Sequence, residues 1–185
     1  ETQEALERQT TSADVLRVIS SSVADTQPVF ERILQGCDRL FAGTWQSIFL
    51  FDEESRQMRL VAHHGPSREV LDRIFPLPLK EGHPLQQPLR DGKALRFDDV
   101  LEGKDVVPEA RQVIQAMGFG NCSQVFVPLV WNGRGIGTLV MVRTPPLPFG
   151  DADIAQIRTF ADQAVIAIQN ARLFHETREA LERQT

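Results

Sequence analysis

Two cysteines and four histidines are the side chains in this sequence best suited to nucleophilic, redox or metal chemistry. Cys37 lies within an apolar helical stripe and is predicted to be a buried core thiol. Cys122 has no histidine near it in sequence to serve as its base, so we interpret it as a small residue leading into a strand. Two cysteines are too few for a disulfide scaffold, so reduced thiols and a cytoplasmic location are expected.

The histidines offer little support for a metal centre. His63 and His64 are adjacent in a run with strand character, so their side chains should point to opposite faces of a sheet. No pair of histidines has the spacing or the nearby carboxylates of a metal site, and none is predicted. A single imidazole would suffice as the axial ligand of a haem, so haem stays open.

The composition is that of an ordinary globular domain. The chain has 185 residues, 42% hydrophobic and 24% charged, which fits one core with helical extensions better than two cores. A formal charge of -5 provides no basic surface for a phosphate backbone, so no nucleic-acid partner is expected. No apolar run approaches the roughly 18 residues that span a bilayer, and the acidic start does not resemble a signal peptide. No membrane contact is therefore expected.

Helical periodicity marks both ends of the chain. Residues 4–23 carry a narrow apolar stripe typical of a coiled-coil seam, and a second helix is predicted from Pro28 to about Gly43. A final helix is predicted from Asp151, which can cap its first turn, without a breaker to Thr185. Its stripe is wide enough to cover a sheet and then to meet a partner helix.

The segment between these helices has strand character. Runs 45–51 and 57–64 form a predicted hairpin, in which Met58, Leu60, Ala62 and His64 share one face. Runs 123–131 and 135–143 form a second one, because the Asn132-Gly133 turn tolerates positive φ angles.

The rest of this middle segment is a long Pro-rich connection. Residues 65–93 are expected to hold two short helices, at 68–74 and 84–90. A short strand at 94–98 and a helix at 108–117 should follow. A connection this long usually builds a binding site or is mobile.

The two ends of the chain repeat each other. Residues 1–10 and 176–185 are identical at nine of ten positions, differing only at Gln3 and Arg178. We interpret the chain as one unit of a tandem array with a period of 175 residues, against the alternative of a cloning scar or two similar helix ends.

Several segments together match the pattern of one family. They are Val127-Pro128-Leu129, the Asn132-Gly133 turn, the return strand 135–139 and the helix 160–174. These segments resemble the GAF sensory domain of bacterial signalling proteins, with the resemblance covering residues 26–174. Residues 1–25 would then be a signalling helix or linker, and residues 175–185 the start of the next connecting helix.

The resemblance implies an α+β fold. Its sheet would be antiparallel, with five or six strands, helices on both sides and long N- and C-terminal coiled-coil helices. The terminal helices would cover one face, and residues 65–117 would close a ligand pocket on the other. If a small molecule binds, we expect it on the pocket side at His64, Arg68, Phe75, His83, Arg96, Met117 and Cys122. Arg68 and Arg96 are the residues suited to an anionic ligand.

Several ligand chemistries known for the family are not expected here. Bilin-binding members attach the chromophore through a Cys followed by His, whereas Ser123 follows Cys122. The cyclic-nucleotide motif is matched only at Phe149 and Asp153. Free methionine sulfoxide reductases depend on several cysteines in an arrangement that two cysteines at these positions do not reproduce.

The prediction is therefore a non-catalytic sensory unit of a multidomain bacterial protein. The parent would be a sensor histidine kinase of a two-component system, with a nucleotide cyclase as the alternative. A ligand-free spacer that only dimerises is the second hypothesis. We expect a parallel homodimer, joined to adjacent GAF and output domains, whose contact residues are Ile154, Ile157, Ala161, Ala164, Ile168 and Ala171 with Leu6, Leu16, Ile19 and Val23. For the first six residues, packing on the domain's own sheet is the alternative.

Overall fold

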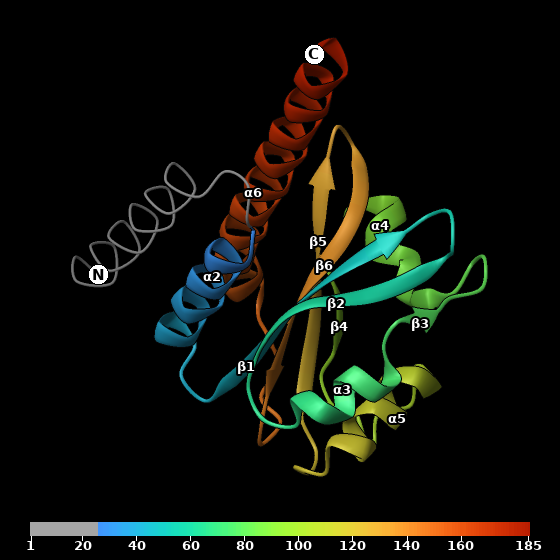
Figure 1. Ribbon diagram of the computed structural model, residues 1–185. Coiled ribbons are helices and arrows are strands. Elements are labelled where there is room, and N and C mark those ends of the chain that lie inside the picture. The colour runs from blue at the N-terminus through green and yellow to red at the C-terminus, as the bar shows by residue number, and fades with distance from the viewer. Residues whose placement is uncertain (1–25) are drawn as a thin grey trace.

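The computed structural model describes residues 26–185 and shows a six-stranded antiparallel sheet with helices on both faces (Figure 1). The strand order is β3-β2-β1-β6-β5-β4. The strands are β1 (Thr44–Asp52), β2 (Gln57–His64), β3 (Leu77–Pro78), β4 (Leu95–Phe97), β5 (Ser123–Trp131) and β6 (Arg134–Arg143). The α+β architecture predicted from the sequence is confirmed. The predicted first helix, with Leu6, Leu16, Ile19 and Val23, lies outside the described residues.

Both predicted hairpins form, and each contains a bulge that the sequence pattern did not reveal. In the β5–β6 pair, Leu129 lies opposite Gly137 and Val130 opposite Gly135, so β6 carries one extra residue at Ile136. Asn132 (φ 49°) and Gly133 (φ 74°) make the two-residue turn between β5 and β6. In the β1–β2 pair, Ile48 lies opposite Ala62 and Phe49 opposite Leu60, so β2 carries one extra residue at Val61. The extra residue shifts the alternation of β2, so His63 rather than His64 lies on the face of Met58 and Leu60.

One face of the sheet is covered by α2 (Gln27–Leu40) and α6 (Asp151–Gln184), which lie next to each other (Figure 1). Pro28 occupies the first turn of α2, where its missing N–H costs nothing. The core on this face is closely packed: Ile33, Leu139 and Ile157 have no exposed surface. Residues 172–185 are all exposed, and Figure 1 shows this end of α6 extending beyond the sheet.

The opposite face is covered by short elements from the long connection. They are α3 (Arg68–Ile74), the 3-10 turn Pro84–Gln86, α4 (Gln87–Asp91) and α5 (Pro108–Met117). Helix α4 packs very closely on β6. A Cβ at Gly135 would come within 2.3 Å of Leu89 Cα, so only glycine fits there. The connection thus holds the short helices expected from the sequence, and in addition the edge strand β3.

The stripe of α6 that we expected at a dimer contact packs on the domain's own sheet. Ile157, Ala161, Ala164 and Ala171 have no more than 8% of their surface exposed, and Ile154 and Ile168 are half-buried against the same core. Side chains without exposed surface have nothing to offer a second copy. The alternative stated for this stripe, packing on the sheet, is the arrangement observed.

None of the helices in residues 26–185 is both long and apolar enough to pass through a bilayer.

Candidate functional site

The face covered by α3 and α5 contains a cavity of about 60 Å³ between the sheet and these helices. Because strand side chains alternate, every second residue of three strands reaches its floor. The floor residues are Trp45, Ser47 and Phe49 of β1, Thr138, Val140 and Val142 of β6, and Gln124 and Phe126 of β5. Helix α5 contributes Met117 and Ile114 to the wall, and Phe75 follows α3.

The strand register places Val140 at the centre of this floor. Val140 is opposite Ser47 on one side and Phe126 on the other. Thr138 precedes Val140 by two residues in β6 and lies on the same face, and Gln124 lies two residues from Phe126 on β5. Three polar side chains, those of Ser47, Gln124 and Thr138, therefore surround an apolar centre. In the sequence each is a single polar residue within an otherwise apolar strand.

Two of these polar groups are left without a partner. Among residues 26–185, the buried side-chain atoms that lack a hydrogen bond are Gln46 Oε1, Gln124 Oε1, Thr138 Oγ1 and Gln163 Oε1. Only Gln124 and Thr138 of these residues line the cavity. An unpaired buried polar group costs about 1–3 kcal/mol, so the cavity floor is less stable than an apolar one would be.

The third polar group, Ser47, is hydrogen-bonded to His63. Ser47 Oγ lies 2.8 Å from His63 Nδ1, and His63 Nε2 lies 3.0 Å from the carbonyl oxygen of Pro66. A carbonyl can only accept, so Nε2 carries the proton and Nδ1 accepts from the Ser47 hydroxyl. Burial lowers the pKa of His63 and favours this neutral ring. Ser47 Oγ keeps its lone pairs free to accept a further hydrogen bond.

A hydroxyl paired with a histidine is also the beginning of a nucleophilic site. Acyl transfer would need, in addition, donors that stabilise a developing oxyanion. No Lys or Arg side chain is among the described residues that line the cavity. The arrangement supplies hydrogen bonding to a bound molecule.

Glu109 and His83 connect α5 to the segment that precedes α4. His83 Nε2 lies 3.1 Å from Glu109 Oε2, and His83 Nδ1 accepts from the Leu85 amide at 3.2 Å. Burial of Glu109 opposes its ionisation, but backbone hydrogen bonding and His83 outweigh burial and hold the pKa of Glu109 below its ordinary value. Glu109 is thus an anion on the cavity wall.

Two of the seven residues expected at the pocket, Phe75 and Met117, line the cavity. His83 does not line it but holds Glu109, which does. His64 lies on the other face, 3.7 Å from Asp38 of α2, because the β2 bulge reverses the alternation.

The remaining three lie outside the cavity. Arg68 pairs with Asp72 in the next turn of α3 at 3.0 Å. Arg96 donates to the carbonyl of Phe149 and pairs with Asp151, at 3.0 and 3.3 Å. Cys122 is buried in the core on the α5 side. The residues missed from the sequence were Ser47, His63, Glu109, Gln124 and Thr138.

Both thiols are unsuited to nucleophilic chemistry. Burial, followed by the nearby Asp99 charge, raises the pKa of Cys122 to about 12. Burial also raises the pKa of Cys37, which has no exposed surface. The thiolate is the reactive form, so neither residue provides one at neutral pH.

Haem does not fit the residues present. Both ring nitrogens of His63 are engaged, and a cavity of about 60 Å³ is smaller than the roughly 150 Å³ in which an engineered apolar cavity takes benzene. A macrocycle would need the α3–α5 face to open.

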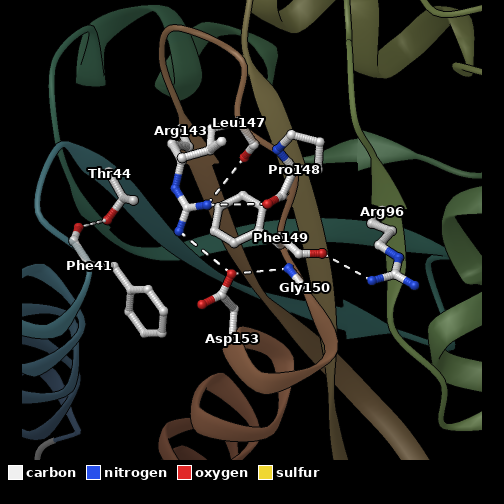
Figure 2. A network of polar contacts seen from close by, with 9 residues as sticks. All are labelled: Phe41, Thr44, Arg96, Arg143, Leu147, Pro148, Phe149, Gly150 and Asp153. Atoms are coloured by element: carbon white, nitrogen blue, oxygen red, sulfur yellow. Dashed lines mark hydrogen bonds and ion pairs between the residues drawn. The ribbon is translucent and has the colours of Figure 1, made fainter.

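A polar network at one corner of the sheet joins the strands to α6 (Figure 2). We call Thr44, Arg143, Phe149 and Asp153 the corner network. The Arg143 guanidinium donates to the carbonyls of Leu147 and Pro148, lies 3.8 Å from Asp153 Oδ2 and covers the Phe149 ring at 4.3 Å. Asp153 also accepts from the Gly150 amide at 3.0 Å, which caps the first turn of α6.

The same corner receives α2. Thr44 donates to the carbonyl of Phe41, the C-cap residue of α2, and lies opposite Arg143 in the sheet. The next residues inward, Trp45 and Val142, are paired with each other and line the cavity. The residue pair that lines the cavity is therefore the immediate neighbour, along both strands, of the pair at which the two helices join the sheet.

Comparison with known proteins identifies one family. A family model described as "GAF domain" matches residues 23–169. A search of curated protein sequences gave no significant match.

Solved structures extend the similarity to the fold. A domain ascribed to a two-component sensor histidine kinase of Sinorhizobium meliloti has a TM-score of 0.64 and 25% identity, covering 82% of this chain and 95% of that one. A GAF domain/HD domain protein of Geobacter sulfurreducens has a TM-score of 0.68 and 24% identity, covering 83% and 97%. Free methionine-R-sulfoxide reductase of Neisseria meningitidis, solved with its substrate, has a TM-score of 0.69 and 20% identity, covering 92% and 93%.

Proposed function

The chain belongs to the GAF domain family, and we propose that it is a non-catalytic sensory unit that binds a small molecule and passes the change to α6. The parent would be a bacterial cytoplasmic signalling protein, with a sensor histidine kinase favoured because one such protein supplies a similar domain at 25% identity. A nucleotide cyclase is the alternative parent. Adjacent GAF units and an output domain would continue the chain in a tandem array.

One observation carries this proposal: the cavity borders the corner network. The paired residues Trp45 and Val142 line the cavity, and the paired residues Thr44 and Arg143 next to them hold the ends of α2 and α6. A bound molecule that moves the floor by a fraction of an ångström would act on the first turn of α6 through Arg143 and Asp153.

The dimer contact in this proposal uses the exposed face of α6. Ile166, Leu173, Phe174 and Leu181 are each at least 41% exposed. At about 100° per residue, these four side chains lie within roughly 100° of one another around the helix. A parallel pairing of two such helices would bury them as a coiled-coil seam, together with Leu6, Leu16, Ile19 and Val23 of the first helix.

The ligand-free spacer is a second candidate, and the size of the cavity favours it. A volume of about 60 Å³ holds a few water molecules in its present form. A spacer would dimerise through α6 and respond to no small molecule.

A thermal-shift screen of metabolites, followed by native mass spectrometry of the hits, separates the two candidates. A sensory unit should gain thermal stability with at least one compound and retain it at a one-to-one mass ratio. A dimer that responds to nothing in a broad screen would contradict the sensory proposal and favour the spacer.

Light scattering tests the dimer. The wild type should be a dimer at tens of micromolar, and Leu173→Glu should make it a monomer because the charge falls in the seam. His175→Glu is the matched control, since it adds the same charge on the opposite face of α6 and should leave the dimer intact. A monomeric wild type, or a dimeric Leu173→Glu variant, would show that this face of α6 is not the dimer contact.

A further inference from the structure

The wall of the cavity has an electrostatic character that restricts what it can bind. Glu109 is the only residue with a full charge among the described residues that line it, because His63 is neutral. A molecule entering the cavity would therefore meet one anion and no cation.

The floor holds buried acceptor atoms that no donor among residues 26–185 reaches. Gln124 Oε1 accepts only, and it has no donor opposite it. Ser47 already donates a hydrogen bond from its hydroxyl to His63 Nδ1, so its oxygen can only accept a further one. Thr138 Oγ1, also unpaired, can accept or donate. A ligand that pairs with Gln124 Oε1 must bring a donor.

The neighbouring arginines are committed elsewhere. Arg111 of α5 donates to the carbonyls of Val100 and Gly103. Arg68 pairs with Asp72, and Arg96 pairs with Asp151. A carboxylate or phosphate in the cavity would lie beside Glu109 without a compensating cation, which is costly in a buried site.

Resting on the sensory function proposed above, we propose that the cavity takes a small aliphatic molecule that donates hydrogen bonds and carries no negative charge, an alcohol or an amine. This differs from the anionic ligand expected from Arg68 and Arg96. Val140 and the surrounding apolar side chains receive the hydrocarbon, and Gln124 and Thr138 receive the donors. An ammonium group would in addition face Glu109.

The size of the cavity restricts the ligand to a small molecule. About 60 Å³ is less than half of the roughly 150 Å³ that accommodates benzene. Met58 and Met117 in its lining are flexible side chains that can move to enlarge it. Four or five carbons fit only after that enlargement.

The test compares four probes with one carbon skeleton: 3-methylbutan-1-ol, 3-methylbutan-1-amine, 1-methoxy-3-methylbutane and 3-methylbutanoate. Dissociation constants are measured by NMR titration of the Val140 and Met117 methyl groups, which locates binding in the cavity. The alcohol, the amine or both should bind at least about tenfold more tightly than the ether and the carboxylate, since the ether has no donor and the carboxylate is an anion.

Variants assign the effect to the floor. In a protein with Thr138→Val and Gln124→Leu together, the alcohol and the ether should bind about equally. Gln163→Leu is the matched control, because Gln163 Oε1 is also buried and unpaired but lies away from the cavity. That variant should keep the preference for the alcohol.

Three results of these titrations would overturn parts of the proposal. Binding of 3-methylbutanoate as tight as that of the alcohol overturns the ligand class but leaves a small-molecule sensor. An unchanged preference for the alcohol in the Thr138→Val, Gln124→Leu protein overturns the role of the floor. Failure of all four probes overturns this inference alone, and the metabolite screen then decides between sensor and spacer.

Discussion

The two faces of the sheet differ in how closely their side chains are packed. Under α2 and α6, long helices cover a floor of apolar side chains, and Ile33, Leu139 and Ile157 are wholly buried. Under α3 and α5, short helices cover a floor that contains a cavity, and the unpaired atoms Gln124 Oε1 and Thr138 Oγ1 belong to residues that line it. Gln46 Oε1 and Gln163 Oε1, on the α2–α6 side, are also unpaired but lie away from this cavity. The same six strands supply both faces, because alternate residues of each strand point in opposite directions.

The difference between the two faces indicates that stability is reduced on the cavity face. A protein selected only for stability would fill the cavity and replace Gln124 and Thr138 with apolar residues. The packed face instead carries stability and the connection to α6, while the cavity face keeps unfilled space with unpaired polar atoms along it. This division is what a ligand-binding function in the cavity would require.

The largest predicted effect compares truncations on the two faces. Ile157→Ala should lower the free energy of unfolding by about 4 kcal/mol, whereas Ile114→Ala should lower it by about 2 kcal/mol. Both side chains are buried, but Ile114 borders the existing cavity and has fewer atoms around it to lose. Urea unfolding measures both values. Equal losses would contradict the contrast between a packed and an unfilled face.

The next effect concerns the corner network that connects the faces. Arg143→Gln should lower the free energy of unfolding by about 2 kcal/mol, because two hydrogen bonds, the ion pair with Asp153 and the contact with Phe149 are lost. The loss is measured by urea unfolding. Arg134→Gln is the matched control, since its ion pair with Glu53 is exposed on both sides and should change stability by less than about 1 kcal/mol. Equal effects would mean that Arg143 is an ordinary surface residue.

A smaller effect, opposite in sign on the two faces, comes from adding one methylene. Val140→Ile should raise the free energy of unfolding by about 1 kcal/mol by filling the cavity, and Val127→Ile should lower it by about 1–2 kcal/mol by overpacking the α6 face. Thermal unfolding of both variants gives the sign. A destabilised Val140→Ile protein would show that the cavity face is as closely packed as the other.

The smallest predicted effect is a pH dependence confined to the cavity face. Burial lowers the pKa of His63, so the unfolded chain binds this proton more readily than the folded one. The stabilisation is complete above the unfolded pKa of about 6.5 and is lost as the pH falls below it. Urea unfolding between pH 7.5 and 5 should show this slope, and His63→Gln should reduce it. An unchanged slope in the variant would place the titrating group elsewhere. Carboxylates with lowered pKa values, such as Glu109, act only at lower pH.

Much of the fold could be predicted from local patterns. The Asn132-Gly133 turn, the Pro28 helix start and the uninterrupted final helix were visible because each depends on neighbouring residues. The bulge at Val61 was not, because one extra residue in a hairpin leaves the apolar pattern almost unchanged. That single residue moved His64 off the cavity face and brought His63 onto it.

The candidate site was predictable only in part for a related reason. Phe75 and Met117 belong to short elements that had to cover one face, whereas Ser47, Gln124 and Thr138 are single polar residues within apolar strands. Their position in the sequence gives no register between strands. A polar residue in a strand that is apolar on both faces was the one available signal.

The most direct test of the whole account is amide hydrogen exchange with and without 3-methylbutan-1-ol. If the cavity acts on α6 through the corner network, exchange should change in the cavity floor and also in residues 151–158 of α6, and Arg143→Gln should abolish only the second change. A change confined to the cavity-lining residues in the wild-type protein would contradict coupling between the two faces.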